Sequence, residues 1–258
     1  MDKAIGVFDS GIGGLSILNS LVEKLPNENF IYLSDNKNCP YGNKSREQII
    51  NFSLKNSKKL IELNCKMIIV ACNTATTNSI DLLREKINVP IIGIEPGIRP
   101  ALLNTKSKNI GILATEKTLE SKLFNSTSKN NLTNDITIHK QIGYGLVNEI
   151  EKGIDGNILI EKYLKKYVSP MIEKNIDYLV LGCTHYNFLE EKLNKLFSKN
   201  IKIVDTILAV TSHVIKTLEN LKIKNNIISK KSVNIYYNGD KILSEFNCNK
   251  YELSYLDF

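Results

Sequence analysis

Two cysteines in matching contexts are the residues of this 258-residue chain whose chemistry stands out. Cys72 follows an apolar run in "VACNTAT", and Cys183 follows another in "VLGCTHYN". Inverting a carbon stereocentre requires one group that removes a proton and a second that delivers one to the opposite face. A free thiol is only weakly ionised at neutral pH, so each cysteine also needs a neighbour that takes its proton. Two facing cysteines could do this; two inert core thiols are the alternative interpretation.

Asp9 and His185 are the ionisable residues best placed to assist these thiols. Asp9 lies in "FDSGIGGLS", whose glycines allow close backbone approach and whose following helix offers N–H groups to an anion. A carboxylate in such a turn would repel an anion. Asp9 is therefore interpreted as a proton partner or a clamp for an ammonium group, with a helix N-cap as the alternative. His185 comes two residues after Cys183, where its ring could tune that thiol across physiological pH.

Neutral hydroxyl and amide side chains follow the same strand ends. They can bind carboxylate oxygens without adding positive charge, although each alone is more often a helix N-cap. These residues are Ser10, Asn73, Thr74, Thr115, Thr118 and Thr184. The other cysteines, Cys39, Cys65 and Cys248, have no partner motif and are interpreted as incidental. Without C-x-x-C or Cys/His ligand spacing, we expect no metal site and no disulfide framework.

Short apolar runs alternate with amphipathic stretches along the whole chain. This alternation predicts an α/β fold with mainly parallel sheets covered by helices on both faces, in which ligands bind at the carboxyl ends of strands. Both cysteines lie at such an end. Strands are predicted over 4–8, 30–34, 67–71, 90–94, 109–114, 135–140, 178–182, 201–204 and 233–237. Helices are predicted over 14–25, 46–63, 75–87, 156–174, 186–198 and 206–220.

The segments that lead to the two cysteines are similar to each other. Aligning the cysteines sets "KKLIELNCKMIIVAC" over "SPMIEKNIDYLVLGC", and each half reads helix, short turn, buried strand, cysteine, helix. This duplication predicts two pseudo-symmetric, doubly wound domains with the active site in the cleft between them. The prolines and glycines of 93–100 predict one crossing between domains, and a second is expected near Asp205. The predicted domains are 1–97 plus 208–258, and 98–207.

The net charge of +7 is spread over lysine- and asparagine-rich segments. No arginine cluster or aromatic platform accompanies it, so we expect a solvated basic surface and no nucleic-acid partner. A positive protein still favours a small anionic substrate. No apolar run approaches the length of a membrane span, and the N-terminus enters a strand almost at once, so we expect no membrane association, no signal peptide and a cytoplasmic location.

The segments "IGVFDSGIGGLS", "PYGNKS", "ACNTAT", "IEPG" and "LGCTHY" resemble, in order and spacing, the signature segments of glutamate racemases. The resemblance runs through almost the whole chain. It implies a cofactor-independent isomerase that interconverts L- and D-glutamate by two-base 1,1-proton transfer, supplies D-glutamate for peptidoglycan and works as a homodimer. Aspartate racemases are less similar, because their opening lacks this Asp-Ser pair and an acidic residue usually stands in the place of His185.

The resemblance also implies roles for individual residues. Cys72 would deprotonate D-glutamate with help from Asp9, and Cys183 would deprotonate L-glutamate with help from His185. The positions that match substrate-binding residues are Ser10, Pro40, Tyr41, Gly42, Asn73, Thr74, Thr115, Thr118 and Thr184. The chain departs from the family in "GLVNEIEKG", where Asn148 stands at the position of a glutamate that supports the histidine, and Glu149 and Glu151 are the candidate replacements.

Three other functions stay open at this point. One is a racemase of aspartate or another acidic compound, and a second is a hydrolase with one nucleophilic cysteine. A hydrolase would need no symmetric second thiol. The third is a protein that binds an acidic amino acid without turnover, for which loss of one cysteine is the expected sign.

Overall fold

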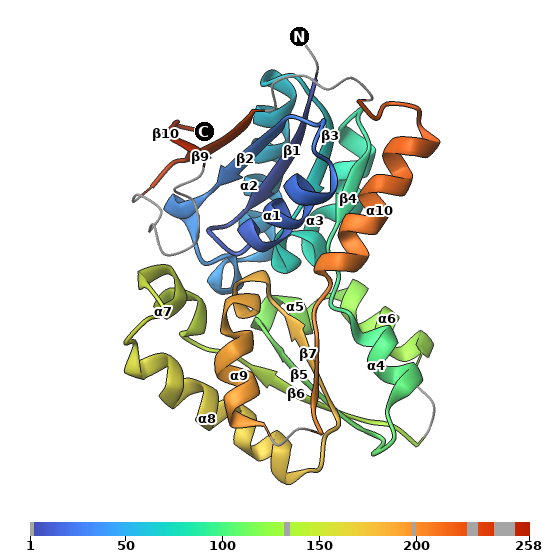
Figure 1. Cartoon of the computed structure of the whole chain (residues 1–258), viewed down its shortest axis with the longest axis vertical. Coiled ribbons are helices and arrows are strands. Elements are labelled where there is room, and N and C mark those ends of the chain that lie inside the picture. Colours follow the sequence, from blue (N-terminus) through green and yellow to red (C-terminus); the bar gives the residue numbers. More distant parts are fainter. Residues whose placement is uncertain (1–2, 132–134, 198–199, 226–231, 240–250) are drawn as a thin grey trace.

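The computed structural model describes residues 3–131, 135–197, 200–225, 232–239 and 251–258, which form two lobes (Figure 1). Each lobe is built on one parallel sheet with helices on both faces. The predicted α/β class with parallel sheets is therefore confirmed. None of the helices in these ranges is long and apolar enough to cross a lipid bilayer.

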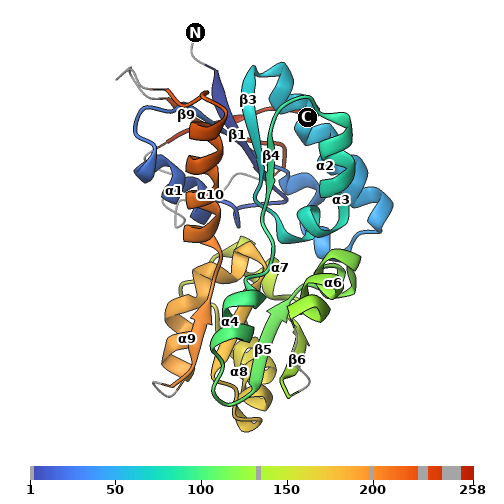
Figure 2. The same ribbon diagram turned by 90° about the vertical axis from the view of Figure 1, so that its right-hand side faces the viewer.

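The first sheet has the strand order β10-β9-β2-β1-β3-β4, and all neighbouring pairs are parallel. Its strands are β1 (Ala4–Asp9), β2 (Phe30–Ser34), β3 (Cys65–Val70), β4 (Ile91–Gly93), β9 (Val233–Tyr237) and β10 (Glu252–Tyr255). Because successive side chains point to opposite faces, Val7 joins one core cluster and Phe8 the other. Helices α1 (Leu15–Lys24) and α10 (Ile207–Asn220) cover the first face, and α2 (Arg46–Glu62) and α3 (Asn73–Lys86) cover the second (Figure 2).

The second sheet has the order β6-β5-β7-β8 and is parallel throughout. Its strands are β5 (Asn109–Ala114), β6 (Thr137–Ile142), β7 (Tyr178–Gly182) and β8 (Lys202–Val204). Helices α4 (Ile98–Asn104) and α6 (Lys122–Asn131) pack on one face, and α8 (Ile158–Glu173) and α9 (Glu190–Leu196) pack on the other. The short helices α5 (Glu116–Glu120) and α7 (Leu146–Lys152) follow β5 and β6. Both short helices carry or border residues of the candidate site.

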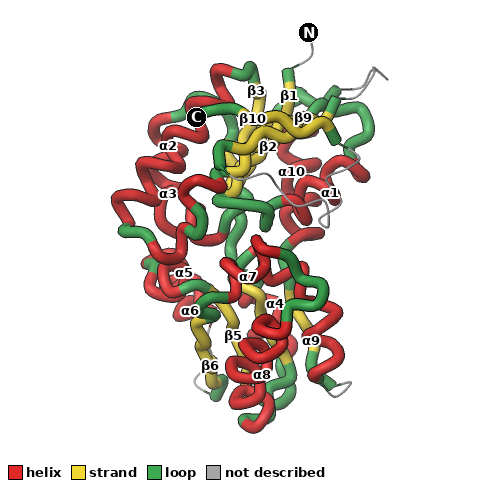
Figure 3. The backbone as a smooth tube through the Cα atoms, turned by 90° about the vertical axis from the view of Figure 1, so that its left-hand side faces the viewer, coloured by secondary structure: helices red, strands yellow, loops and turns green. Residues whose placement is uncertain are grey.

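The predicted strands are all present, and the differences from the predicted elements have local causes. β10 was not predicted, because it is a short strand at the edge of the first sheet, where its side chains are exposed or half-buried (Figure 3). The predicted helix over 186–198 begins as a 3₁₀ helix, η3 (Thr184–Leu189), before α9. Two further 3₁₀ turns, η1 (Asn36–Asn38) and η2 (Tyr41–Asn43), precede α2.

The strands of the first sheet all lie within 1–97 and 208–258, and those of the second lie within 98–207. The domain boundaries themselves stay a prediction. The boundary between the two lobes is called the seam below. The carboxyl ends of β1, β3 and β7 meet at this seam. Ser10, after β1, contacts Cys72, after β3, and Thr184, after β7, contacts Asp9, at the end of β1. That seam is where the sequence places its cysteines.

Candidate active site

Cys72 lies between the end of β3 and the start of α3. Its sulfur accepts a hydrogen bond from the Ala75 N–H at 3.5 Å and so caps the helix. The hydroxyl of Ser10 is 3.8 Å from the same sulfur. Burial holds the pKa of the Cys72 thiol well above its ordinary value, and the charges of Asp9 and Cys183 add to the rise. Cys183 is thus near enough to contribute to the rise in the pKa of Cys72.

Asp9 joins the two lobes at the end of β1. One of its carboxylate oxygens accepts hydrogen bonds from the Gly11 N–H at 2.9 Å and the Ser10 hydroxyl at 3.3 Å. The other accepts a hydrogen bond from the Thr184 hydroxyl of the second lobe at 2.9 Å. Burial raises the pKa of Asp9 to about 6, against the opposing effect of the nearby His185. This carboxyl group can therefore exchange a proton near neutral pH.

His185 stands between Cys183 and an acidic partner. Its Nδ1 is 3.9 Å from the Cys183 sulfur, and its Nε2 is 2.6 Å from Oε1 of Glu151 in α7. Burial would lower the pKa of His185, but contacts with Cys183, Cys39 and Glu151 outweigh it and hold that pKa well above its ordinary value. Burial likewise opposes the charge of Glu151, but its bonds to His185 and to the Ile12 N–H keep its pKa below the ordinary value. These directions describe an ion pair between a buried imidazolium and a half-buried carboxylate.

This arrangement distinguishes the two glutamates that the sequence left open. Glu151 lies against His185, whereas Glu149 bonds Lys152 at 2.8 Å and Asn157 at 3.2 Å, away from the histidine. Glu149 is itself buried, but its partners belong to α7 and the turn that follows it. The resemblance to glutamate racemases implied a supporting glutamate at the position where this chain has Asn148. In the structure it is Glu151 that contacts the histidine.

The glycines of the "DSGIGG" turn let this backbone reach the histidine pair. A Cβ atom on Gly11 would lie 1.9 Å from Oε1 of Glu151, and one on Gly13 would lie 2.5 Å from Nδ1 of His185. Any other side chain would push these groups apart. The turn also supplies the Ile12 N–H, which donates to Glu151 at 2.9 Å. The glycines are thus required by close approach across the seam.

Three buried threonines form a hydroxyl cluster at the same seam. Thr74 at the start of α3 is 2.9 Å from Thr115 and 3.4 Å from Thr118, and the last two are 3.0 Å apart. Thr115 also caps α5 through the Thr118 N–H. Because hydroxyl groups can donate to an incoming anion in place of one another, the cluster can bind a carboxylate without adding charge.

The other predicted substrate residues line the first lobe's side of the seam. The amide of Asn73 donates to the Ile94 carbonyl at 3.5 Å. The buried hydroxyl of Tyr41 donates to the Asp35 carboxylate and accepts from the Asn56 amide. A small pocket reaches Pro40, Gly42 and Thr115. The Tyr41 hydroxyl is thus occupied by the protein, whereas Pro40 and Gly42 border open space.

Cys39, which was interpreted from sequence as incidental, lies next to the histidine pair. Its sulfur is 3.6 Å from Oε1 of Glu151, and burial raises the pKa of its thiol to about 12. Cys65 packs in a hydrophobic core cluster, and Cys248 lies outside the described residues. No short-range pattern could have indicated Cys39, because its neighbours in space come from α7 and η3.

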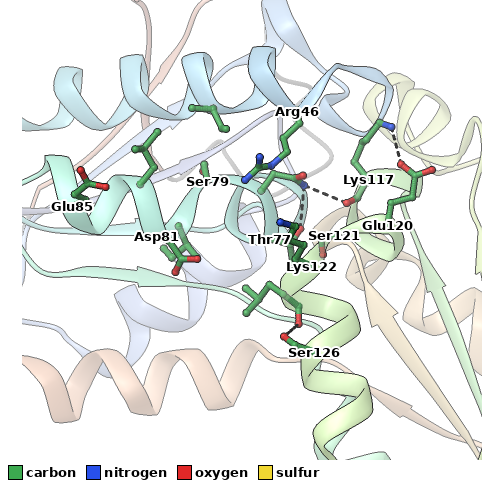
Figure 4. A pocket seen from close by; sticks show the side chains of 15 residues that line it. Arg46, Thr77, Ser79, Asp81, Glu85, Lys117, Glu120, Ser121, Lys122 and Ser126 are labelled. Carbon is green, nitrogen blue, oxygen red and sulfur yellow. Dashed lines mark hydrogen bonds and ion pairs between the residues drawn. The ribbon is translucent and has the colours of Figure 1, made fainter.

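A cavity of about 790 Å³ lies beside α2, α3, α5 and α6, with polar and charged side chains around it (Figure 4). Its lining includes Arg46, Asp81 and Lys117, but neither Cys72 nor Cys183. The Lys117 ammonium is paired with Glu120 at 2.8 Å. This cavity is therefore remote from the two cysteines. We locate the candidate active site from the ionisable residues at the seam and not from the volume of this cavity.

Comparison with known proteins agrees with this geometry. Residues 5–214 match the family described as Asp/Glu/Hydantoin racemase. The chain is 43% identical over 214 residues to a glutamate racemase of Ralstonia pickettii, covering 83% of this chain and 76% of that one. It is 39% identical over 248 residues to a glutamate racemase of Clostridium botulinum, covering 95% and 96%.

The fold is similar to that of a solved structure, the Escherichia coli glutamate racemase in complex with L-glutamate and the activator UDP-MurNAc-Ala. The TM-score is 0.87 at 28% identity, over 99% of this chain and 98% of that one. Sequence, fold and the paired thiols at the seam agree, and the chain belongs to the Asp/Glu/hydantoin racemase family.

Proposed function

We propose that this chain interconverts L- and D-glutamate by two-base 1,1-proton transfer and supplies D-glutamate for peptidoglycan synthesis. Its relatives are glutamate racemases along most of their length, and the similar Escherichia coli structure holds L-glutamate. One observation carries the proposal: each of the two thiols has its own proton partner. Cys72 contacts Ser10, which contacts Asp9. Cys183 contacts His185, which contacts Glu151.

On the first side, Cys72 removes the α-proton of D-glutamate. Its proton first passes toward Asp9, with the Ser10 hydroxyl between the two groups. Burial keeps the Cys72 thiol neutral in the absence of substrate. The ammonium group of the substrate then stabilises the thiolate in this dry environment. Asp9, whose pKa is about 6, is a carboxylate at neutral pH and accepts the proton.

On the second side, Cys183 delivers a proton to the opposite face of the α-carbon, and the same residue removes the α-proton of L-glutamate in the reverse direction. The His185 imidazolium can return a proton to Cys183 through Nδ1. Glu151 holds the ring in place through Nε2 and keeps it protonated.

Neutral donors at the seam would hold the two carboxylates of the substrate. The groups that could do so are the hydroxyls of Ser10, Thr74, Thr115, Thr118 and Thr184, the amide of Asn73, and the turn at Pro40–Gly42. The α-carbanion forms next to a carboxylate, so the site must stabilise negative charge with fixed dipoles. The threonine cluster and the N–H groups at the start of the 14-residue helix α3 suit this role.

The proposal includes turnover without a cofactor, a cytoplasmic location and a homodimer. Two thiols can act as both acid and base, so the proton transfer needs no electron sink such as pyridoxal phosphate. Full activity of the dialysed protein with no added cofactor is the expected result. Light scattering on the same sample would test the dimer.

The decisive experiment follows the α-hydrogen of L-glutamate in deuterium oxide by NMR while circular dichroism follows racemisation. Deuterium should enter the α-position as the signal decays to zero. The Cys72→Ser and Cys183→Ser variants should each lose activity by about 100-fold or more, because each removes one of two required proton-transfer groups. A hydrolase would release a new product and depend on one cysteine only. L-Aspartate turning over as fast as L-glutamate would contradict the proposed substrate.

A further inference from the structure

Three potential metal ligands meet beside the candidate active site. They are the Cys39 thiol between η1 and η2, the Glu151 carboxylate in α7 and the His185 imidazole in η3. One ligand atom from each lies within 4.8 Å of the other two. Cys39 Sγ is 3.6 Å and His185 Nε2 is 2.6 Å from Oε1 of Glu151. Within the described residues, no other group of three such side chains is this close.

We propose that Cys39, Glu151 and His185 bind a thiophilic divalent cation of the Zn²⁺ type, and that the bound ion inhibits the enzyme because it replaces the imidazolium proton with which His185 serves Cys183. The inhibitory part rests on the proposed function, whereas the binding part does not.

The geometry of the three donors suits such an ion. Thiolate, imidazole and carboxylate are ligands of zinc, and a tetrahedral ion with bonds near 2.0–2.3 Å separates its ligand atoms by roughly 3.4 Å. The Cys39–Glu151 distance of 3.6 Å already fits this spacing. The His185–Glu151 distance of 2.6 Å must open by less than about 1 Å, which small side-chain rotations allow. A water molecule can complete the fourth position.

The surroundings of the three donors also support binding. The Ile12 N–H donates to Oε1 of Glu151 at 2.9 Å and the Asn36 amide donates to Oε2 at 3.4 Å, and these two bonds fix the orientation of the carboxylate. Such supporting hydrogen bonds are usual for carboxylates that bind metals. The His185 side chain is 2% exposed and that of Glu151 is 19% exposed, so an ion can approach from the side of Glu151.

Charge balance removes the usual objection to placing an ion in a buried site. Without metal, the imidazolium of His185 and the carboxylate of Glu151 cancel. On binding, the thiol proton of Cys39 and the imidazolium proton of His185 leave to the solvent. The divalent ion then faces one thiolate, one carboxylate and a neutral ring, and the site is again neutral. The exchange buries no additional net charge, which would otherwise be costly.

The expected consequence for catalysis follows from the position of His185. A neutral ring whose Nε2 is bound to a cation keeps only its Nδ1 proton, which is a far weaker acid than an imidazolium, and it has no free nitrogen that could accept a proton from Cys183. Racemisation should fall when the ion binds and should recover when a chelator removes it. Cys72 and Asp9 on the other side of the substrate keep their contacts.

The test uses the purified full-length protein, with Co²⁺ as a spectroscopic probe and buffered Zn²⁺ as the inhibitor. Wild type should show a near-ultraviolet thiolate-to-cobalt absorption band and reversible zinc inhibition. Cys39→Ala should lose the band and require at least about 10-fold more zinc for half inhibition, each variant being compared with its own metal-free rate. Cys65→Ala, which removes a core thiol remote from the cluster, and Cys72→Ser should both retain the band. Cys39→Ser is the second variant if Cys39→Ala does not fold.

Two results would overturn the metal site: no cobalt band in wild type, or a band and zinc sensitivity unchanged in Cys39→Ala. Equal loss of the band in Cys65→Ala would also overturn it, because the effect would not be specific to the cluster. Absence of racemisation in the metal-free wild type would instead contradict the proposed function and leave the cobalt result standing.

Discussion

The hydroxyl of Thr184 donates a hydrogen bond of 2.9 Å to the carboxylate of Asp9, across the seam between the two sheets. Asp9 ends β1 in the first lobe, and Thr184 directly follows Cys183 in the second. Both side chains are buried. The contact therefore joins the carboxylate near Cys72 to the residue directly after Cys183, and so ties together the two segments that carry the thiols.

Replacing Thr184 by valine should destabilise the protein. The change keeps the shape of the side chain but removes the donor to a buried carboxylate oxygen, and such a loss is expected to lower the free energy of unfolding by about 1–3 kcal/mol. Urea unfolding of wild type and Thr184→Val measures it. Thr217→Val is the matched control, since the Thr217 hydroxyl donates only to the His213 carbonyl in its own helix. A similar loss of unfolding free energy in both variants would show that the contact between the lobes stabilises the protein no more than a hydrogen bond within one helix.

Asp9 should make stability depend on pH in a definite direction. Burial raises its pKa from 3.8 to about 6, so between these values the folded state binds more protons than the unfolded chain. The free energy of unfolding should therefore fall as the pH rises through this window, by about 3 kcal/mol from this group. The penalty is complete above the folded pKa and absent below the unfolded one.

The Asp9→Asn variant isolates this contribution. Asparagine has the same size and cannot ionise, so the difference in unfolding free energy between variant and wild type should change between about pH 4.5 and about pH 7. Relative to wild type, the variant should be more stable at the higher pH than at the lower. A difference that is the same at both values would show that Asp9 is not buried in the way described.

The strand ends of the site could be predicted from sequence because their signals are local. Apolar runs mark β1, β3 and β7, and the residue that follows each run must lie at the carboxyl edge of its sheet. Asp9, Cys72 and Cys183 were found in this way. The short helix α7 gives too few turns for a clear period, so the orientation of the residues that it carries could not be predicted.

The partner of His185 could not be predicted from local sequence signals. Glu149 and Glu151 are two positions apart on α7, and the sequence alone could not say which of them faces the histidine. The choice depends on how α7 is oriented by the turn after β6 and on the space left by Gly11. Cys39 joins the same cluster from a loop of the other lobe. These placements come from tertiary packing, for which a sequence motif carries no direct signal.

His185 should support proton transfer at Cys183 rather than at Cys72. A racemase has an equilibrium constant of one, so His185→Asn must lower kcat/KM equally in both directions, by about 100-fold if a proton-transfer group is lost. Kinetic isotope effects show which of the two cysteines His185 assists. With α-deuterated substrates, the isotope effect should increase for L-glutamate, from which Cys183 removes the proton, and stay near its wild-type size for D-glutamate. An equal increase for both would contradict the assigned side.

Glu151 and Glu149 form a matched pair for testing the support of the histidine. Glu151→Gln removes the charge that keeps His185 protonated, so it should lower kcat/KM with the same isotope signature as His185→Asn. Glu149→Gln changes the same helix at a position away from the histidine, where the partners are Lys152 and Asn157. Its kinetics should match wild type. Loss of activity in Glu149→Gln alone would reverse the assignment.

Gly11→Ala should act on catalysis through Glu151. The added methyl group would lie 1.9 Å from Oε1 of Glu151, which is the end of a flexible side chain and can rotate away. The fold should therefore tolerate the change, while His185 loses its partner and kcat/KM falls as in Glu151→Gln. If the two substitutions act through the same contact, the double variant Gly11→Ala/Glu151→Gln should be little slower than either single variant. Additive losses in the cycle would mean that Gly11 shapes the site by another route, such as the backbone of the turn that carries Asp9 and Ser10.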